Sequence, residues 1–283
     1  KGGFMPINTG IFAEMPFSEY LEIDAMNCST LKKVAQSPRH AQHELVTPSE
    51  PSAAFVIGDA FHALVLEPER FAAEFAQGLD CGKRTKADKE AWEDWYEAHP
   101  DVTGLKPEDW DTIHAMREAV LDHSTAAEVM AGEGENELTM VWADPITNTL
   151  CKGRADRLTN YKGQSVIADL KSTIDASPEG WGRSSARFAY HQQAAWYLAG
   201  ANVLAPLDRR FLFVCCEKKP PYGVTVQELN ADALKAGAKL NRIYLHRWLK
   251  CLDTKQFTGY PDGVLNYGLP GWALNEIDRI EEN

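Results

Sequence analysis

The stretches Leu150-Cys-Lys-Gly-Arg-Ala-Asp-Arg-Leu158 and Val166-Ile-Ala-Asp-Leu-Lys171 decide the fold of this chain. Both are short β-prone runs, and the residues between them, Asn160-Tyr-Lys-Gly163, have the composition of a turn. The two stretches therefore predict an antiparallel hairpin. Because side chains alternate between the faces of a strand, Asp169 and Lys171 point to one side, opposite Val166, Ala168 and Leu170. The hairpin can then bring Asp156 alongside Asp169.

Outward from this hairpin, the pattern predicts a sheet with helices before and after it. A third β-prone run precedes the hairpin, so the runs 138–143, 149–158 and 165–170 predict three antiparallel strands. Two further strands are expected at 210–216 and 223–229, and helices at 178–201 and 232–252. In the N-terminal part, a short helix begins at the N-cap pair Ser29-Thr30 and ends at Ser37-Pro38, and further helices are expected at 55–66, 86–98 and 107–130. The segment 258–269 predicts irregular packing.

The sequence contains no internal repeat, low-complexity stretch or linker, which favours a single α/β domain over residues 1–283. Its parts are a mainly helical segment at 1–136, a sheet with the following helix at 137–230, and a final helix and tail at 231–283. The expected architecture is a mixed central sheet flanked by helices.

Composition narrows the class of protein. Of the 283 residues, 44% are hydrophobic and 25% are charged, which excludes a disordered or collagenous chain. The net charge is -12, so nucleic acid or an anionic membrane would be held only by a local basic patch. No apolar run approaches the roughly 18 residues of a membrane span, and the first ten residues lack a secretion signal. Six scattered cysteines without a Cys-x-x-Cys pair predict reduced thiols in a cytoplasmic protein, with no membrane partner.

The paired aspartates indicate a metal site. Two carboxylates that meet in a partly buried sheet repel each other unless a cation lies between them, and Mg²⁺ prefers oxygen ligands. Lys171 could orient or deprotonate an attacking water, or stabilise charge on a phosphoryl oxygen. This pattern predicts metal-assisted phosphodiester hydrolysis. The alternative is a surface salt-bridge ladder without catalytic function.

One basic segment surrounds these residues. Between 151 and 200 there are seven basic and four acidic residues, in a protein that is otherwise acidic. We expect such an island to guide a phosphate backbone towards the site. Its basic members are Lys152, Arg154, Arg157, Lys162, Lys171, Arg183 and Arg187.

Three ordered motifs resemble a known superfamily. Asp156, then Asp169-Leu-Lys171, then Gln193-Ala-Ala-Trp-Tyr197 are similar to the RecB-like branch of the PD-(D/E)xK nucleases, which adds a Gln-x-x-x-Tyr helix. The likeness to the RecE-like exonucleases, a group related to phage lambda exonuclease, extends over nearly the whole chain. It rests on Gly58-Asp-Ala-Phe-His62, Val65-Leu-Glu-Pro-Glu69, Lys83-Arg-Thr85, Tyr190-His-Gln-Gln193 and Leu269-Pro270-x-Trp272. The chain departs from many members in having Asp169 where they have Glu.

The resemblance implies a restriction-endonuclease-like core and a set of site residues. Metal ligation would come from Asp156, Asp169, the Leu170 carbonyl and His62, with Lys171 as the catalytic lysine and Gln193 and Tyr197 facing the site. Without the resemblance, His62 would read as a core histidine, and Gln193 and Tyr197 as a surface pair. Glu137 matches an acidic residue near the site, although Glu133 and Glu135 compete for that role.

The resemblance also implies an activity: a processive 5′-to-3′ exodeoxyribonuclease of prophage type. It would depend on Mg²⁺ or Mn²⁺, with two ions per site, and act on linear duplex DNA. It would release 5′-mononucleotides and leave 3′ single strand for recombination. A homotrimeric or homotetrameric ring and a single-strand annealing protein would be its partners. Expected DNA-binding residues are Lys152, Arg154, Arg157, Arg183 and Arg187, with Ser29 as a 5′-phosphate contact or an ordinary cap. The alternatives are an endonuclease, an end-trimming nuclease, or an inactive DNA-binding subunit.

Overall fold

The central hairpin forms as its turn residues predict. In the computed structural model, which describes residues 8–47, 52–82, 84–269, 271 and 274, strand β5 (Leu150–Tyr161) turns into β6 (Gln164–Thr173) through Lys162 and Gly163. Both turn residues have positive φ, at 53° and 79°, a conformation that suits glycine. The Gly163 N–H also donates to Asn160 Oδ1 at 2.9 Å. The turn therefore holds the register of the two strands.

Six strands form one mixed sheet in the order β1-β4-β5-β6-β7-β8. All neighbours are antiparallel except β6 and β7, which pair in parallel. This confirms the three antiparallel strands and the mixed sheet. The remaining strands are β1 (Gly10–Phe12), β4 (Gly134–Ala143), β7 (Arg209–Glu217) and β8 (Val224–Glu228).

The helices lie where the apolar periodicity predicts them. As predicted, α2 (Cys28–Gln36) ends at Ser37, which is extended, and Pro38 then starts α3 (Pro38–Val46), a helix that was not expected. Two other expected runs are each divided in two. Ala189, at φ 54°, separates α9 (Pro178–Arg187) from α10 (Tyr190–Leu204). His123 separates α7 (Pro107–Asp122) from α8 (Ser124–Ala131). The other long helices are α4 (Ala53–Leu66), α6 (Lys86–Ala98) and α11 (Ala231–Thr254).

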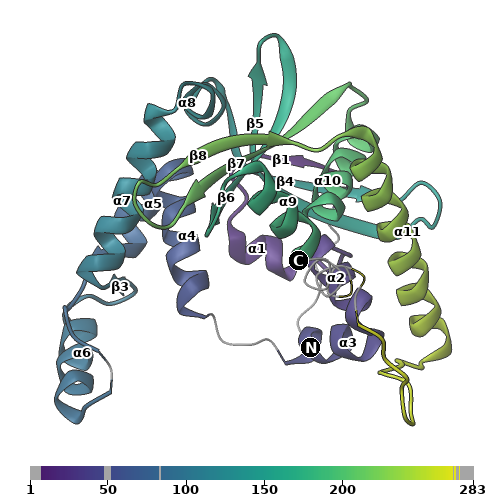
Figure 1. Cartoon of the computed structure of the whole chain (residues 1–283), viewed down its shortest axis with the longest axis horizontal. Coiled ribbons are helices and arrows are strands. Elements are labelled where there is room, and N and C mark those ends of the chain that lie inside the picture. The colour runs from purple at the N-terminus through teal and green to yellow at the C-terminus, as the bar shows by residue number, and fades with distance from the viewer. Residues whose placement is uncertain (1–7, 48–51, 83, 270, 272–273, 275–283) are drawn as a thin grey trace, which may run out of the picture.

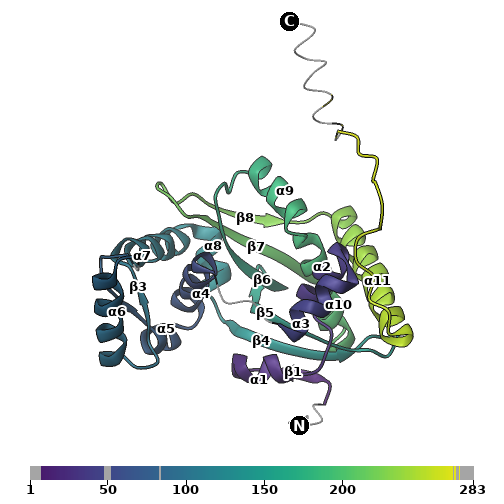
Figure 2. The same cartoon turned by 90° about the horizontal axis from the view of Figure 1, so that it is seen from below.

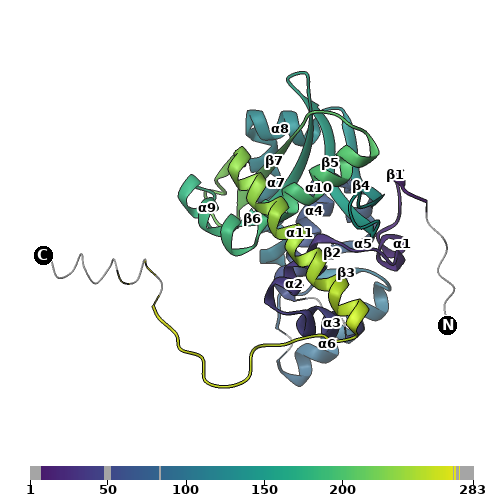
Figure 3. The ribbon, with the colours of Figure 1, turned by 90° about the vertical axis from the view of Figure 1, so that its right-hand side faces the viewer.

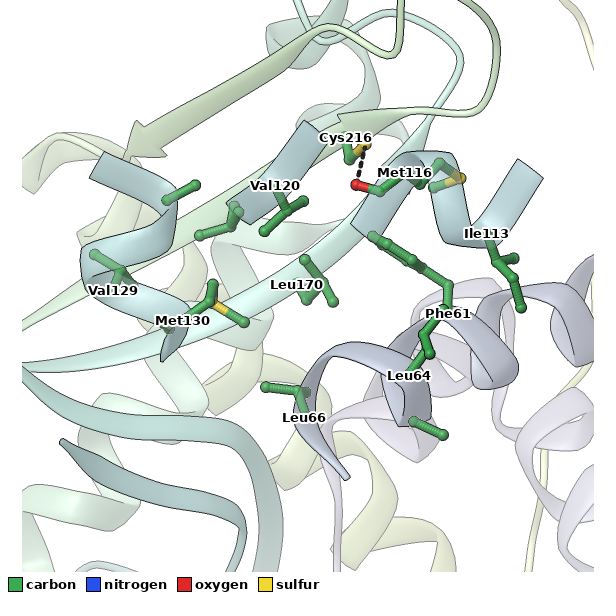
Figure 4. Packing of buried hydrophobic residues seen from close by; sticks show 14 of the residues in the cluster. Phe61, Leu64, Leu66, Ile113, Met116, Val120, Val129, Met130, Leu170 and Cys216 are labelled. Carbon is green, nitrogen blue, oxygen red and sulfur yellow. Dashed lines mark hydrogen bonds between the residues drawn. The ribbon is translucent and has the colours of Figure 1, made fainter. Parts of the chain in front are cut away.

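Helices cover both faces of the sheet (Figures 1 and 2). On one side, Val166, Ala168 and Leu170 of β6 pack with α4, α7 and α8. Figure 4 shows Phe61 and Leu64 of α4 facing Leu170, with Met116 of α7 beside Cys216. On the other side, Ile167 and Phe213 pack with residues of α2, α10 and α11. Figure 3 shows α11 lying along α10 on this side. The alternating faces of β6 thus belong to two hydrophobic clusters, as predicted.

Several short elements were not expected from the sequence. They are α1 (Phe17–Glu22), α5 (Pro68–Glu74), and the parallel pair β2 (Phe75–Gln77) and β3 (Thr103–Leu105). Together with α6, the β2–β3 pair projects from the end of α7 (Figure 1). The segment 258–269 contains no helix or strand, as predicted. Lys83, Pro270 and Trp272, which contributed to the family resemblance, lie outside the described residues. Among the described helices, none is long and apolar enough to cross a membrane.

Candidate active site

Three carboxylates lie side by side across three strands. The β5–β6 ladder runs from Tyr161–Gln164 to Arg157–Ala168 and then stops, so the next opposed positions are Asp156 and Asp169. The β4–β5 ladder is interrupted between Asn136–Arg157 and Leu138–Ala155, which leaves Glu137 opposite Asp156. Like charges directly opposed in a sheet are destabilising. The strands therefore hold together groups that repel one another.

Local backbone geometry adapts to this arrangement. Glu137 has φ 50°, a left-handed conformation that costs a residue with a Cβ about 1–2 kcal/mol. Where β5 and β6 separate, the Leu170 N–H donates to Asp156 Oδ2 at 2.8 Å and so replaces a ladder bond. The Leu170 side chain is fully buried. The resemblance implies that the Leu170 carbonyl is a metal ligand, and the contact seen in the structure is made by the Leu170 N–H.

His62 of α4 completes an acidic group with metal-ligand character. Its Nδ1 lies 3.4 Å from Asp156 Oδ2. Ligand atoms of His62, Glu137 and Asp156 all lie within 4.8 Å of one another. Glu135 at the start of β4 and Glu133 just before it are exposed, and neither belongs to this group. The neighbouring Phe61 is fully buried, whereas His62 is half-buried and faces the carboxylates.

Asp169 is held by two predicted partners. It is fully buried, its Oδ1 accepts from Gln193 Nε2 at 2.6 Å, and its Oδ2 pairs with Lys171 Nζ. Gln193 comes from the first turn of α10, whose direction is set by the Ala189 kink. The motif Asp-x-Lys and the α10 glutamine thus form one contact network.

Tyr197 lies one helical turn beyond Gln193 and is also half-buried. Its ring packs against the backbone of Gly153 on β5. A Cβ at Gly153 would lie 2.9 Å from the Tyr197 ring, so this close approach requires glycine. Burial raises the pKa of Tyr197 well above its ordinary value, with Tyr20 and Asp169 contributing. No hydrogen bond from its hydroxyl is seen among the described residues.

The site's ionisable groups are strongly perturbed. Burial raises the pKa of Asp156 to about 8, and the charge of Asp169 adds to the rise. Burial and then Asp156 raise the pKa of Glu137 to about 7, although Arg154 opposes them. Burial lowers the pKa of His62, and Lys171 lowers it further. Burial favours the neutral amine of Lys171, but Asp169 and Asp156 outweigh it and raise its pKa. These groups carry more negative charge than their surroundings stabilise, which a cation would neutralise.

Two basic residues predicted to bind DNA are structural. Lys152 is buried, and its Nζ donates to the carbonyls of Tyr20, Leu21 and Ile23 at 2.8, 3.3 and 2.8 Å. Arg157 is buried, and its Nε donates to the Val129 carbonyl at 2.8 Å. In a strand that is buried on both faces, the side chains on either face point into the protein. The number of basic residues along β5 therefore overestimated the positive charge on the surface. The prediction that these two residues contact DNA is wrong.

Arg154 has a different part in the site. Its Nε donates to Glu137 Oε2 at 2.7 Å, and its Nη1 donates to the Met15 carbonyl at 2.7 Å. Its side chain is 11% exposed. Arg154 therefore orients Glu137, a role that the sequence did not predict. The spacing of the β4–β5 hairpin contained this signal, because Thr139 pairs with Arg154 and Glu137 is its diagonal neighbour.

The other predicted DNA contacts are on the surface. The Arg183 side chain is 74% exposed, and its Nη2 lies 3.5 Å from Asp175 Oδ2. Arg187 is exposed at the end of α9. Ser29 is exposed but does not cap α2. The cap is Asn27, whose Oδ1 accepts from the Thr30 N–H at 2.8 Å. The predicted N-cap at Ser29-Thr30 is therefore wrong by two residues.

Sequence reasoning gave no place in the site to Lys32 and Tyr190. Lys32 Nζ lies 5.5 Å from the centre of the Tyr190 ring, and Lys171 Nζ lies 5.2 Å from it. Burial lowers the pKa of Lys32, and Lys171 lowers it further against the opposing effect of Cys28. No spacing rule connects α2 with β6, so only the packing of α2 reveals this neighbourhood.

Comparison with known proteins agrees with the motifs. Residues 27–264 match the family model described as a PDDEXK-like domain of unknown function (DUF3799). No curated protein matches the chain. A crystal structure named "Putative exonuclease", from Eubacterium rectale, has a TM-score of 0.60 at 13% identity, and the match covers 91% of this chain and 95% of that one. Protein SSO0001 matches with a TM-score of 0.35 at 13% identity, over 81% of each chain. Protein VC1899 from Vibrio cholerae has a TM-score of 0.24 at 11% identity, over 83% of this chain and 60% of that one.

Proposed function

The chain belongs to the family of PDDEXK-like domains, and from that premise we propose that it is a metal-dependent nuclease. One observation carries the proposal. Asp156, Glu137 and His62 converge beside an Asp169–Lys171–Gln193 network, at the point where β5 and β6 separate. A plain salt-bridge ladder would place its charges in solvent, whereas Asp169 here is fully buried. Burial with unbalanced negative charge favours the site over the ladder.

The acidic group suits a divalent cation. The pKa of Asp156 is raised to about 8 and that of Glu137 to about 7, so the two cannot easily be charged together without a cation. The ligands would be Asp156, Glu137 and His62, with Asp169 adjoining them. We propose Mg²⁺, because carboxylate oxygens are the ligands Mg²⁺ prefers. Mn²⁺ as a substitute and two ions per site are proposed from the resemblance alone. Such a cation supplies neutralisation of charge on a phosphoryl group.

The protein's own groups would place the substrate and the water. Lys171 Nζ can donate to a water or to a phosphoryl oxygen, and its pairing with Asp169 fixes its position. Gln193 restrains the other oxygen of Asp169, so the carboxylate cannot rotate away. Arg154 restrains Glu137 in the same way. Preorganisation of this kind lowers the reorganisation needed when charge develops on the phosphoryl group.

The finer activity rests on resemblance. We propose a processive 5′-to-3′ exonuclease that acts on linear duplex DNA, releases 5′-mononucleotides and leaves 3′ single strand for recombination with an annealing protein. The RecE-like motifs support this, as does the name of the E. rectale structure, although that structure is similar in fold alone. Core chemistry does not fix the shape of the substrate, so an endonuclease or an end-trimming nuclease is the second candidate.

The decisive experiment uses linear duplex DNA labelled at one 5′ or one 3′ end. With Mg²⁺, we expect the 5′ label to be released as mononucleotide while the 3′-labelled strand stays long. Release of the 3′ label first would reverse the polarity, and internal cuts would favour the endonuclease. No hydrolysis with either Mg²⁺ or Mn²⁺ would favour an inactive DNA-binding subunit.

A further inference from the structure

A row of cations and aromatic rings leads from the site to the surface. The ammonium nitrogen of Lys171 lies 5.2 Å from the centre of the Tyr190 ring, and that of Lys32 lies 5.5 Å from it. The Phe188 ring follows at 5.8 Å from Tyr190, and the Arg187 guanidinium lies 5.4 Å from the Phe188 ring. Exposure increases along the row: Lys171 is 17% exposed and Phe188 is 50% exposed. The row therefore has one end in the site and one end in solvent.

Packing holds the inner part of the row rigid. The Tyr190 ring stacks on buried Trp181 at 5.0 Å with an interplanar angle of 15°. It also contacts Phe213 of β7 at 5.6 Å. The left-handed backbone of Ala189 sets Phe188 and Tyr190 on either side of the kink between α9 and α10. The rings are thus fixed before any ligand arrives, which reduces the entropy lost on binding.

Two cations of this row, Lys32 and Arg187, have no ion-pair partner among the described residues, whereas Lys171 pairs with Asp169. The protein nevertheless has a net charge of -12. Lys32 is only half-exposed, and its charge is disfavoured by burial and by the nearby Lys171, with Asp169 opposing them in part. A ligand that fits alternating cations and aromatic rings is a polyanion that also carries flat apolar groups.

We propose that Lys32, Tyr190, Phe188 and Arg187 bind one strand of nucleic acid next to the site, with an unpaired base stacked on Phe188. This inference rests on the proposed nuclease function. Phosphates would lie beside Lys32 and Arg187. Stacking neighbours cover both faces of a base inside a duplex, so an aromatic ring receives such a base only after it has left its stack; in this proposal the strand is single-stranded at Phe188. Arg187 contributes the guanidinium charge and Phe188 the stacking surface.

The test measures binding separately from hydrolysis. One probe is a short fluorescein-labelled oligodeoxythymidine, and the other is a fluorescein-labelled DNA hairpin with a blunt duplex end. Ca²⁺ replaces Mg²⁺ so that binding is measured without hydrolysis. Fluorescence anisotropy gives Kd over a salt series. Phe188→Ala should weaken oligodeoxythymidine binding about 5-fold or more, because stacking on an aromatic ring contributes strongly to single-strand affinity. The hairpin should be affected less, and Phe188→Tyr should restore binding.

Charge is tested through the salt dependence. Arg187→Ala should reduce the slope of log K against log salt by about 0.7, the value expected for one phosphate contact on a single strand. Arg247→Ala is the matched control, since Arg247 stacks at 5.6 Å on the Tyr244 ring of α11 and is exposed. It should change neither Kd nor slope. Thermal melts verify that each variant is folded.

The possible failures are distinguishable. If wild-type protein hydrolyses DNA but Phe188→Ala binds both probes normally, the strand site is wrong and the nuclease function stands. Equal weakening of both probes would also overturn it, because unpaired bases would then not be recognised. If wild-type protein neither hydrolyses DNA nor binds either probe at low salt, the proposed function and the strand site fail together.

Discussion

Asp156 is the residue on which most of the site's electrostatics depends, since it faces Glu137 on one side and Asp169 on the other. We predict that Asp156→Asn abolishes nuclease activity while the free energy of unfolding stays equal or rises. The amide oxygen can still accept from the Leu170 N–H, and the substitution removes repulsion among buried carboxylates. Urea unfolding and hydrolysis of linear duplex measure the two effects. Exposed Asp208→Asn is the control. An active Asp156→Asn protein would contradict the site.

His62 tests whether α4 contributes a ligand or only packing. His62→Ala should raise the Mg²⁺ concentration needed for half-maximal rate, with little change in melting temperature, because the ring is half-buried and its described ionic contact is with Asp156. Phe61→Ala is the contrasting variant, since deleting a fully buried Phe costs about 3–5 kcal/mol. A large loss of stability in His62→Ala with an unchanged Mg²⁺ requirement would make it a core residue.

At the scale of elements, α1 is attached to β5 through Lys152. The ammonium group of Lys152 donates to three backbone carbonyls at the end of α1 and just beyond this helix. These bonds satisfy the three donors of Lys152. Lys152→Met should lower the free energy of unfolding by about 1–3 kcal/mol, because the carbonyls lose their donor. Activity per folded molecule should be preserved. Exposed Lys239→Met should change neither. Unchanged stability together with weaker DNA binding would instead support the original DNA-contact prediction.

The turn between β4 and β5 is joined to α11 by an ion pair that predicts a pH dependence. Arg242 donates to both oxygens of Asp144, at 2.7 and 2.8 Å. Burial opposes ionisation of Asp144, but the Arg242 and Thr147 hydrogen bonds outweigh it and hold its pKa well below the ordinary value. A lowered folded-state pKa gives stability that is present above the unfolded pKa of about 3.9 and is lost as pH falls further.

We therefore expect Asp144→Asn to be less stable than wild type above about pH 5, with the difference shrinking below about pH 4. Urea unfolding from neutral pH to pH 3 measures this. A difference that stays constant over the whole range would mean that the charge of Asp144 does not stabilise the fold. No effect on hydrolysis at neutral pH is expected, because Asp144 and Arg242 line a small separate cavity of about 90 Å³ with Trp142 and Trp196.

For the whole molecule, the expected ring now rests on resemblance alone. The basic island cannot line a channel as a unit, because Lys152 and Arg157 are buried and Arg154 holds Glu137. We still predict a homotrimer or homotetramer, three or four times the chain mass of 31.5 kDa, that digests linear but not covalently closed duplex. Light-scattering mass together with digestion of linear and circular forms of one plasmid tests this. An active monomer, or equal cutting of circles, would favour the endonuclease.

The local elements and the chemistry of the motifs could be predicted from the order of the residues. Turn residues and alternation placed the β5–β6 hairpin, and the order of Asp156, Asp169, Lys171 and Gln193 indicated the family to which the chain belongs. These are short-range properties, since strand alternation and helical spacing repeat every few residues. The points at which the expected helices divide were harder to predict from the sequence. Ala189 precedes α10 in a left-handed conformation, and His123 lies between α7 and α8 in an extended one, with its Nδ1 accepting from the Ala126 N–H. Neither residue type is a usual marker of a helix end.

Which charged side chains are exposed, and which distant ones meet, depends on how the elements pack in space. Lys152 and Arg157 have the charge of surface residues, yet carbonyls from α1 and the α8 region surround them, and no local pattern records that. The choice of Glu137 over Glu133 and Glu135 followed from the break in the β4–β5 ladder opposite Asp156. Lys32 reaches Tyr190 because α2 packs near α10, a contact between segments far apart in the chain. Such contacts depend on the packing of whole elements, because burial and charge pairing are set by neighbours in space rather than in sequence.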